Sequence, residues 1–151
     1  MTKTPLTPDF VAFGLAVTSK KQLLQSLSER AARQHGLCER AVMDAIMKRE
    51  KLGSTAIGDG AALPHATLPQ LSTTVTLLAT LDHPVDFDSP DGDPVDLVAL
   101  VLGHHGDSSS YLTSIKAISQ MLKERGAALR AAHDETTLRA TLSSDVVGAA
   151  A

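Results

Sequence analysis

The residues best suited to do chemistry lie in one stretch of the chain, between Arg49 and His65. A neutral imidazole is nucleophilic near pH 7, because its unperturbed pKa is about 6.5. The guanidinium of Arg49 presents a planar set of donors that matches the oxygens of a phosphate group. Gly53, Gly58 and Gly60 lie between these two side chains, and a backbone without a Cβ atom can approach a ligand closely. These residue types predict a site for phosphoryl chemistry.

The same stretch offers further hydrogen-bond donors for phosphate oxygens. The hydroxyls of Ser54 and Thr55 can each donate one hydrogen bond, and the backbone N–H groups near Gly58 and Gly60 can form an anion-binding nest. No Gly-Lys-Ser/Thr sequence follows the glycines, so the segment is not a P-loop. We therefore expect Ser54, Thr55, Gly58 and Gly60 to bind phosphate around His65.

Length and composition exclude several classes of protein. The 151 residues fit a single domain, 1–151, with room for a hydrophobic core. A net charge of −3 argues against a dedicated nucleic-acid-binding protein, which usually carries a basic surface. The lone cysteine, Cys38, cannot form an internal disulfide, and no apolar run approaches the roughly 20 residues that span a bilayer. We expect a cytoplasmic protein that is not membrane-embedded and has no nucleic-acid partner.

The elements that must position the segment follow from hydrophobic spacing and turn residues. Residues 1–9 are expected to form an extended arm and residues 145–151 a frayed end. Strands are expected over 10–17, 61–63, 71–81 and 95–102, with a bulge at Gly14 and a turn region over 84–94. After an N-cap at Thr18 or Ser19, a helix is expected from Lys20 to Gly36. Further helices are expected over 39–51, from Asp107 or the following serines to Gly126, over 127–132, and after an N-cap at Asp134. Interleaved strands and helices predict an α/β fold with a mixed sheet.

Two features of this pattern bear on the centre of the fold. The nearly continuous apolar run 95–102 predicts a central strand buried on both faces. His104, His105 and Asp107 follow it, and a metal site is one interpretation of these side chains. Adjacent ligands without a fitting third partner favour an exposed polar loop instead.

The segment around His65 resembles the active-site segment of a known family. The residues that carry the resemblance are Arg49-Glu50-Lys51-Leu52-Gly53-Ser54-Thr55, Ile57-Gly58-Asp59-Gly60 and Leu63-Pro64-His65. They are similar to enzyme IIA proteins of the mannitol, fructose and nitrogen branch of the bacterial phosphoenolpyruvate-dependent phosphotransferase system. The order of the expected elements also matches this family over nearly the whole chain. The resemblance implies a mixed central sheet flanked by helices on both sides.

The resemblance also implies roles for particular residues. The histidine at the end of the segment, here His65, accepts a phosphoryl group from the phosphohistidine of HPr or its nitrogen-branch counterpart, and the family suggests the Nε2 atom. One ring nitrogen attacks while an acceptor, expected to be a backbone carbonyl, holds the other. Arg49 stabilises the charge of the phosphoryl group. The family requires no metal, and we expect no other cofactor.

One position departs from the family pattern. A second histidine usually begins the helix after the central strand, whereas this chain has Tyr111 in the sequence Tyr111-Leu112-Thr113-Ser114-Ile115. A phenol can donate a hydrogen bond to a phosphoryl oxygen, but its pKa of about 10 keeps it neutral near pH 7. His104 or His105 in the preceding loop is a possible substitute for the missing imidazolium.

Three functions are compatible with these features. The leading hypothesis is a stand-alone enzyme IIA of the nitrogen-regulatory type, which regulates target proteins according to the phosphorylation state of His65. The first alternative is a carbohydrate-transport enzyme IIA that passes the phosphoryl group to a fructose or mannitol permease component. The second is a regulatory binding module that is no longer phosphorylated, as the change at Tyr111 would suggest.

Overall fold

The structure is a computed structural model that describes residues 8–106 and 108–143. Residues 1–7 of the expected arm, the cap at Asp107 and the frayed end over 145–151 lie outside these residues. In chain order the elements are β1 (Phe10–Leu15), α1 (Lys20–His35), α2 (Glu39–Glu50), β2 (Ala56–Gly58), β3 (Ala61–Ala62), β4 (His65–Leu68), β5 (Val75–Val85), β6 (Val95–His104), α3 (Ser108–Ala131) and α4 (Glu135–Ser143).

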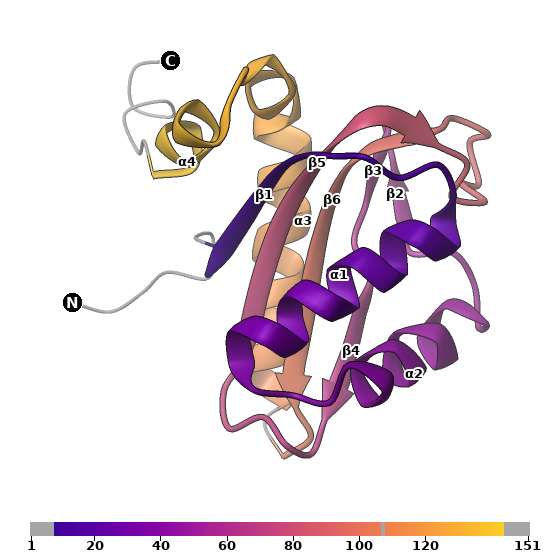
Figure 1. Ribbon diagram of the computed structural model, residues 1–151, viewed down its shortest axis with the longest axis vertical. Coiled ribbons are helices and arrows are strands. Elements are labelled where there is room, and N and C mark those ends of the chain that lie inside the picture. Colours follow the sequence, from indigo (N-terminus) through magenta and orange to yellow (C-terminus); the bar gives the residue numbers. More distant parts are fainter. Residues whose placement is uncertain (1–7, 107, 144–151) are drawn as a thin grey trace.

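The strands form one mixed sheet with helices on both faces. Its order is β1-β5-β6-β3-β2, and β4 also pairs with β6. Helices α1 and α2 cover one face, and α3 crosses the other (Figure 1). The β1–β5 pair and the pairs of β6 with β3 and β4 are parallel, whereas β5–β6 and β2–β3 are antiparallel. The expected α/β fold with a mixed, doubly covered sheet is confirmed.

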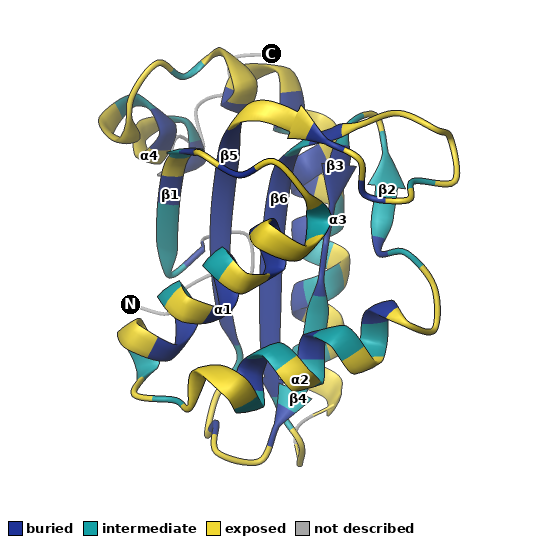
Figure 2. Ribbon diagram, turned by 45° about the vertical axis from the view of Figure 1, so that its right-hand side comes forward, coloured by how far each residue is buried: buried dark blue, intermediate teal, exposed yellow. Residues whose placement is uncertain are grey.

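Strand β6 is the centre of the molecule and is buried on both faces, as its apolar run predicts. Val98, Leu100 and Leu102 belong to the core beneath α1 and α2. Leu97, Ala99 and Val101 belong to the core beneath α3. Because successive side chains of a strand point to opposite faces, one strand supplies both cores. Figure 2 shows β5 and β6 as buried along most of their length.

A broken strand lies along one edge of β6, and His65 follows directly after the break. Ala61 and Ala62 of β3 pair with Leu97 and Val98, and β4 resumes the parallel pairing at His65, opposite Val101. Between them the carbonyl of Pro64 accepts a hydrogen bond from the N–H of Val101 at 3.0 Å. Residues 61–63 were expected to form a strand, whereas β2 and β4 were not. Both are short and lie next to glycines or proline, so neither shows a strand pattern of its own.

Several local signals are confirmed. The backbone of Gly14 has φ 65°, and the β1–β5 register shifts between Ala12 and Leu15, so the expected bulge is present. Ser19 caps α1 at its N-terminus, and Gly36 ends it in the left-handed conformation. The side chain of Asp134 accepts a hydrogen bond from the N–H of Thr137 at 2.7 Å, which is an N-cap before α4.

The expected boundaries of β5 and α3 were wrong. Strand β5 begins at Val75 rather than at residue 71 and continues through Pro84 to Val85. Its register with β6 shifts between Thr80 and Val85, and a proline without an N–H is tolerated at such an irregularity. Helix α3 continues through Gly126 to Ala131, so the expected stop at Gly126 and the separate helix over 127–132 were wrong.

The packing of α3 explains this error. Gly126 is buried within α3, and a Cβ atom at this position would make an ordinary contact with Leu97 of β6 at 3.9 Å, so the residue faces the sheet inside the helix. Leu112 of the same helix is 54% exposed, whereas Ser114 is buried. In the sequence, a glycine after two basic residues favours the end of a helix. In the structure, this glycine lies on the sheet-facing side of α3, and the helix continues through it.

Candidate active site

A cleft of about 340 Å³ brings the main candidate residues together. It lies between the C-terminal end of α2, strand β4 and the start of α3. Arg49 comes from α2, His65 from β4 and Tyr111 from α3, and His105 comes from the turn between β6 and α3. The tertiary structure thus places side chains from four separate segments around one opening.

A backbone hydrogen bond sets the orientation of the His65 ring. Its Nδ1 atom lies 2.8 Å from the carbonyl oxygen of Leu63. A carbonyl can only accept, so the hydrogen atom of the neutral ring is on Nδ1 and the Nε2 atom keeps its lone pair. The expectation that a backbone carbonyl holds one ring nitrogen is confirmed.

The surroundings of His65 favour its neutral form. Burial lowers the pKa of the imidazole below its ordinary value of 6.5, because a charged ring would lose hydration. The Leu63 carbonyl raises this pKa, the positive charge of Arg49 lowers it and the negative charge of Glu50 raises it. The net effect is a lower pKa, so the ring is a neutral nucleophile near pH 7.

Arg49 lies at the end of α2 and contributes positive charge to the cleft. Its Nη1 atom donates to the carbonyl oxygen of Gly53 at 3.0 Å, in the turn after the helix. Its charge acts to lower the pKa of both His65 and Tyr111, and all three side chains line the same cleft. The bond to Gly53 holds the arginine in place and uses one of its five N–H donors.

Tyr111 stands beside His65 at the first turn of α3. The two ring centroids are 6.1 Å apart, with an angle of 55° between the ring planes. Burial raises the pKa of Tyr111 to about 12, while the charge of Arg49 acts in the opposite direction. The phenol is therefore a neutral hydrogen-bond donor across the physiological pH range.

Gly103 of β6 makes the space that Tyr111 occupies. A Cβ atom at Gly103 would lie 2.7 Å from Cγ of the tyrosine ring, which is closer than real contacts allow. The backbone of Gly103 does not have a left-handed φ angle. Glycine is therefore needed here to leave room for the tyrosine ring and not to allow an unusual backbone conformation. The sequence analysis did not identify this pair, because the two residues belong to different elements.

Glu50 is a buried carboxylate that the sequence analysis missed. Its carboxylate forms an ion pair with Nζ of Lys20 at 2.9 Å. It also accepts hydrogen bonds from the hydroxyl and the N–H of Thr55. It thereby ties α1 and the end of α2 to the loop that leads to His65. A sequence signal was present, since Glu50 continues the four-residue spacing of the buried Val42 and Ile46 on α2.

The residues expected to bind phosphate alongside His65 lie elsewhere. The hydroxyl of Ser54 donates to the carbonyl of Phe87 at 2.9 Å, and that of Thr55 donates to Glu50. Gly58 and Gly60 lie in the β2–β3 hairpin, where a Cβ at Gly60 would lie 3.0 Å from Arg130. The cleft around His65 is lined by none of these four residues, so its geometry does not support phosphate contacts from them.

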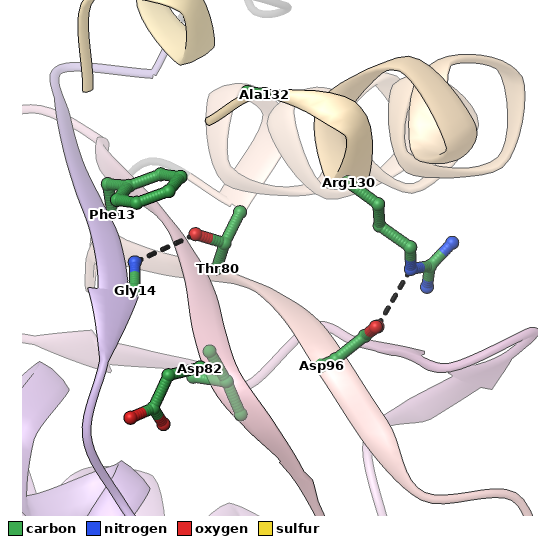
Figure 3. Close-up of a pocket in the computed structure, with 8 residues that line it drawn as sticks. Phe13, Gly14, Thr80, Asp82, Asp96, Arg130 and Ala132 are labelled. Atoms are coloured by element: carbon green, nitrogen blue, oxygen red, sulfur yellow. Dashed lines mark hydrogen bonds and ion pairs between the residues drawn. The ribbon is translucent and has the colours of Figure 1, made fainter. Parts of the chain in front are cut away.

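The hairpin glycines instead adjoin a structural ion pair. Nε of Arg130 donates to Asp96 at 2.7 Å, and its Nη2 atom donates to the carbonyl of Asp59 at 2.7 Å. Figure 3 shows the Arg130–Asp96 pair beside Phe13 and Thr80, at a separate hollow of about 190 Å³. The positive backbone φ angles of Gly58 and Gly60 therefore serve a tight hairpin held to α3.

The two histidines after β6 have different positions. His105 lines the cleft with His65, whereas Nδ1 of His104 is buried without a hydrogen-bond partner among the described residues. Within residues 8–106 and 108–143, no group of three or more His, Cys, Asp or Glu side chains is arranged to hold a metal ion. None of the helices in this part of the chain combines the length and apolar character needed to cross a membrane.

Known proteins of one family are similar to the chain over most of its length. Residues 4–145 match the family described as phosphoenolpyruvate-dependent sugar phosphotransferase system, EIIA 2. A nitrogen regulatory protein of Bradyrhizobium diazoefficiens is 42% identical over 140 residues, which cover 91% of this chain and 92% of that protein.

Solved structures agree with this similarity. The crystal structure of nitrogen regulatory protein IIA-Ntr from Neisseria meningitidis has a TM-score of 0.80 at 28% identity, covering 89% of this chain and 92% of that one. The mannitol enzyme IIA of Escherichia coli, solved in complex with phosphorylated mannitol enzyme IIB, shares the fold with a TM-score of 0.74 at 17% identity, covering 88% and 93%. With its fold, its cleft and its sequence in agreement, the chain belongs to the EIIA 2 family of the phosphoenolpyruvate-dependent phosphotransferase system and is similar to its nitrogen regulatory members.

Proposed function

We propose that Nε2 of His65 accepts a phosphoryl group from the phosphohistidine of an HPr-like carrier protein. The observation that carries this proposal is the 2.8 Å hydrogen bond between Nδ1 and the carbonyl of Leu63, because it leaves the Nε2 lone pair available. The lowered pKa of the ring supports the same role, since a protonated imidazole has no lone pair for attack.

The transfer step is a displacement at phosphorus. The lone pair of Nε2 forms a bond to phosphorus while the phosphorus–nitrogen bond of the carrier breaks, and the electron pair of that bond stays with the carrier's imidazole. The hydrogen on Nδ1 of His65 remains on the ring and donates to Leu63, which stabilises the positive charge that the ring gains. Passing the group to an acceptor reverses the same step.

Two neighbours of His65 support the phosphoryl group. Arg49 places a permanent positive charge beside the cleft and offers donors to the oxygens of the transferring group. Tyr111 donates one neutral hydrogen bond from the position where the family usually has a second histidine. His105 lies in the same cleft and supplies the imidazole that Tyr111 cannot.

We assign the protein to the nitrogen-regulatory branch, in which it regulates target proteins according to its phosphorylation state. The support is the 42% identity to a nitrogen regulatory protein over 91% of the chain. The alternative is transfer to a fructose or mannitol permease component, and the 32% identity over 82 residues to a fructose-specific EIIABC component of Bacillus subtilis favours it. The cytoplasmic location expected from the sequence stays a prediction.

The test is reconstituted phosphorylation followed by intact-mass analysis. The protein is incubated with phosphoenolpyruvate, enzyme I and either the nitrogen-branch carrier or the sugar-branch HPr. We expect an acid-labile phosphoryl group, faster labelling from the nitrogen-branch carrier and no labelling of His65→Ala. Faster labelling from HPr would favour the carbohydrate-transport alternative. If folded wild-type protein gains no phosphate from either carrier, the phosphotransfer proposal fails and the binding-module alternative stands.

A further inference from the structure

A second charged cleft lies at the opposite edge of the sheet from His65. It has a volume of about 190 Å³ and is bounded by β1, α1 and α4. In the sheet order, β5 and β6 separate β1 from β4, so this cleft is distinct from the one around His65. Phe10 and Leu77 contribute apolar surface to its walls, and four charged side chains complete it.

The charged residues of this cleft are mostly arginines. Arg30 and Arg33 come from α1, and Arg139 and Glu135 come from α4, which gives three positive charges against one negative. Arg33 pairs with Glu29 at 3.0 Å and Arg139 pairs with Glu135 at 3.1 Å, each within its own helix. The Arg33–Glu29 pair is largely exposed and weakly held, so Arg33 can turn toward a ligand.

Arg30 differs from the other two arginines. Its Nε atom is buried and has no hydrogen-bond partner in the described part of the chain. Buried polar atoms in proteins are almost always hydrogen-bonded, and a guanidinium can only donate. The missing partner is therefore an acceptor, and an anionic acceptor would also offset the positive charge of the cleft.

We propose that this cleft binds a small dianion through carboxylate or phosphate oxygens. Arginine donors match the geometry of both groups, and helices α1 and α4 present them from two sides. The volume of about 190 Å³ is below the roughly 300–1,000 Å³ of sites for larger ligands, which favours a small anion over a nucleotide. A bound dianion would tie α4 to α1 across β1. This site does not depend on phosphorylation of His65.

The experiment is a titration of the ¹⁵N-labelled protein followed by amide NMR, at constant ionic strength. Inorganic phosphate and succinate are added separately as probes of the two oxygen chemistries. We expect saturable shifts of the amides of Phe10, Arg30, Arg33 and Arg139 with at least one probe. Saturation by phosphate alone identifies a phosphoryl ligand, and saturation by succinate alone identifies a dicarboxylate. Saturation by both probes indicates a site that binds either kind of oxyanion.

Charge-matched variants test the role of Arg30. Arg30→Gln should weaken binding by at least about tenfold, as expected for lost charge-assisted hydrogen bonds. Arg40→Gln removes the same charge from an exposed position of α2 and should bind like the wild type. If Arg30→Gln does not fold, Arg139→Gln at an exposed side chain should also weaken binding. Shifts that grow without saturation for both probes, or equal affinities of the cleft variants and Arg40→Gln, would overturn the proposal.

Discussion

Nδ1 of His65 donates to the carbonyl of Leu63, two residues earlier in the same broken strand, at 2.8 Å. Pro64 lies between them and interrupts the strand without contributing an N–H. The carbonyl of Pro64 pairs with Val101, whereas the carbonyl of Leu63 is turned to the imidazole. The break between β3 and β4 thus selects which nitrogen of His65 carries the hydrogen atom.

The pKa of His65 is expected to lie below 6.5 in an imidazole NMR titration. Burial and the charge of Arg49 favour the neutral ring. At pH values between the folded-state pKa and 6.5, His65 binds more protons in the unfolded chain than in the folded protein. Its contribution to the free energy of unfolding is therefore full above pH 6.5 and is lost as pH falls through the folded-state pKa. The wild type should therefore lose more stability than His65→Ala over that window. A midpoint at or above 6.5 would contradict the burial argument.

Arg49→Ala is expected to slow phosphorylation of His65 by at least about 100-fold, because one preorganised charge donor at a transferring group contributes that much. The measurement is the rate of labelling from the phosphorylated carrier at saturating carrier concentration. Arg40→Ala, on the exposed side of the same helix, is the matched control and should keep the wild-type rate. An unchanged rate for Arg49→Ala would remove this residue from the mechanism.

Tyr111→His is expected to preserve or increase the rate of phosphorylation, because it places a second imidazole beside His65. Tyr111→Phe keeps the ring but removes the hydroxyl donor, and should slow transfer by about tenfold. Both rates are measured in the same labelling assay. A large loss in Tyr111→His, with the fold intact by circular dichroism, would mean that this site has been built around the phenol.

Gly103→Ala is expected to destabilise the protein by about 1–3 kcal/mol, since the new Cβ atom would collide with the ring of Tyr111. The measurement is the free energy of unfolding in urea. In a Tyr111→Ala background the same change should cost much less, because the colliding ring is absent. Equal costs in the two backgrounds would show that the tyrosine ring is not what requires glycine at this position.

Glu50→Gln is expected to lower both stability and the pKa of His65. The change leaves the ammonium of Lys20 without its buried partner, at a cost of about 1–3 kcal/mol. The negative charge of Glu50 raises the pKa of His65, so its removal should lower that pKa further. Urea unfolding and the imidazole titration measure the two effects. Glu39→Gln at the exposed start of α2 is the control, and a His65 pKa unchanged by Glu50→Gln would contradict the electrostatic link.

Much of this protein could be predicted from local sequence. The apolar run of β6, the caps at Ser19, Gly36 and Asp134, and the bulge at Gly14 all depend on neighbouring residues. Short-range hydrophobic spacing and backbone preference decide such features, so they can be read before the fold is known. The choice of His65 and Arg49 likewise followed from residues in one continuous segment.

Other features needed the tertiary structure, because they join segments that are distant in the chain. Gly103 accommodates Tyr111 only because β6 and α3 are packed together, and Glu50 is buried only because Lys20 and Thr55 meet it there. Ser54 and Thr55 look like phosphate ligands in the sequence, yet their hydroxyls hold the loop to Phe87 and to Glu50. The sequence by itself thus determined which residues have the chemistry for phosphoryl transfer. Only the packing of α2, β4 and α3 decided which of them share a cleft, since a side chain's partners depend on contacts that no local pattern encodes.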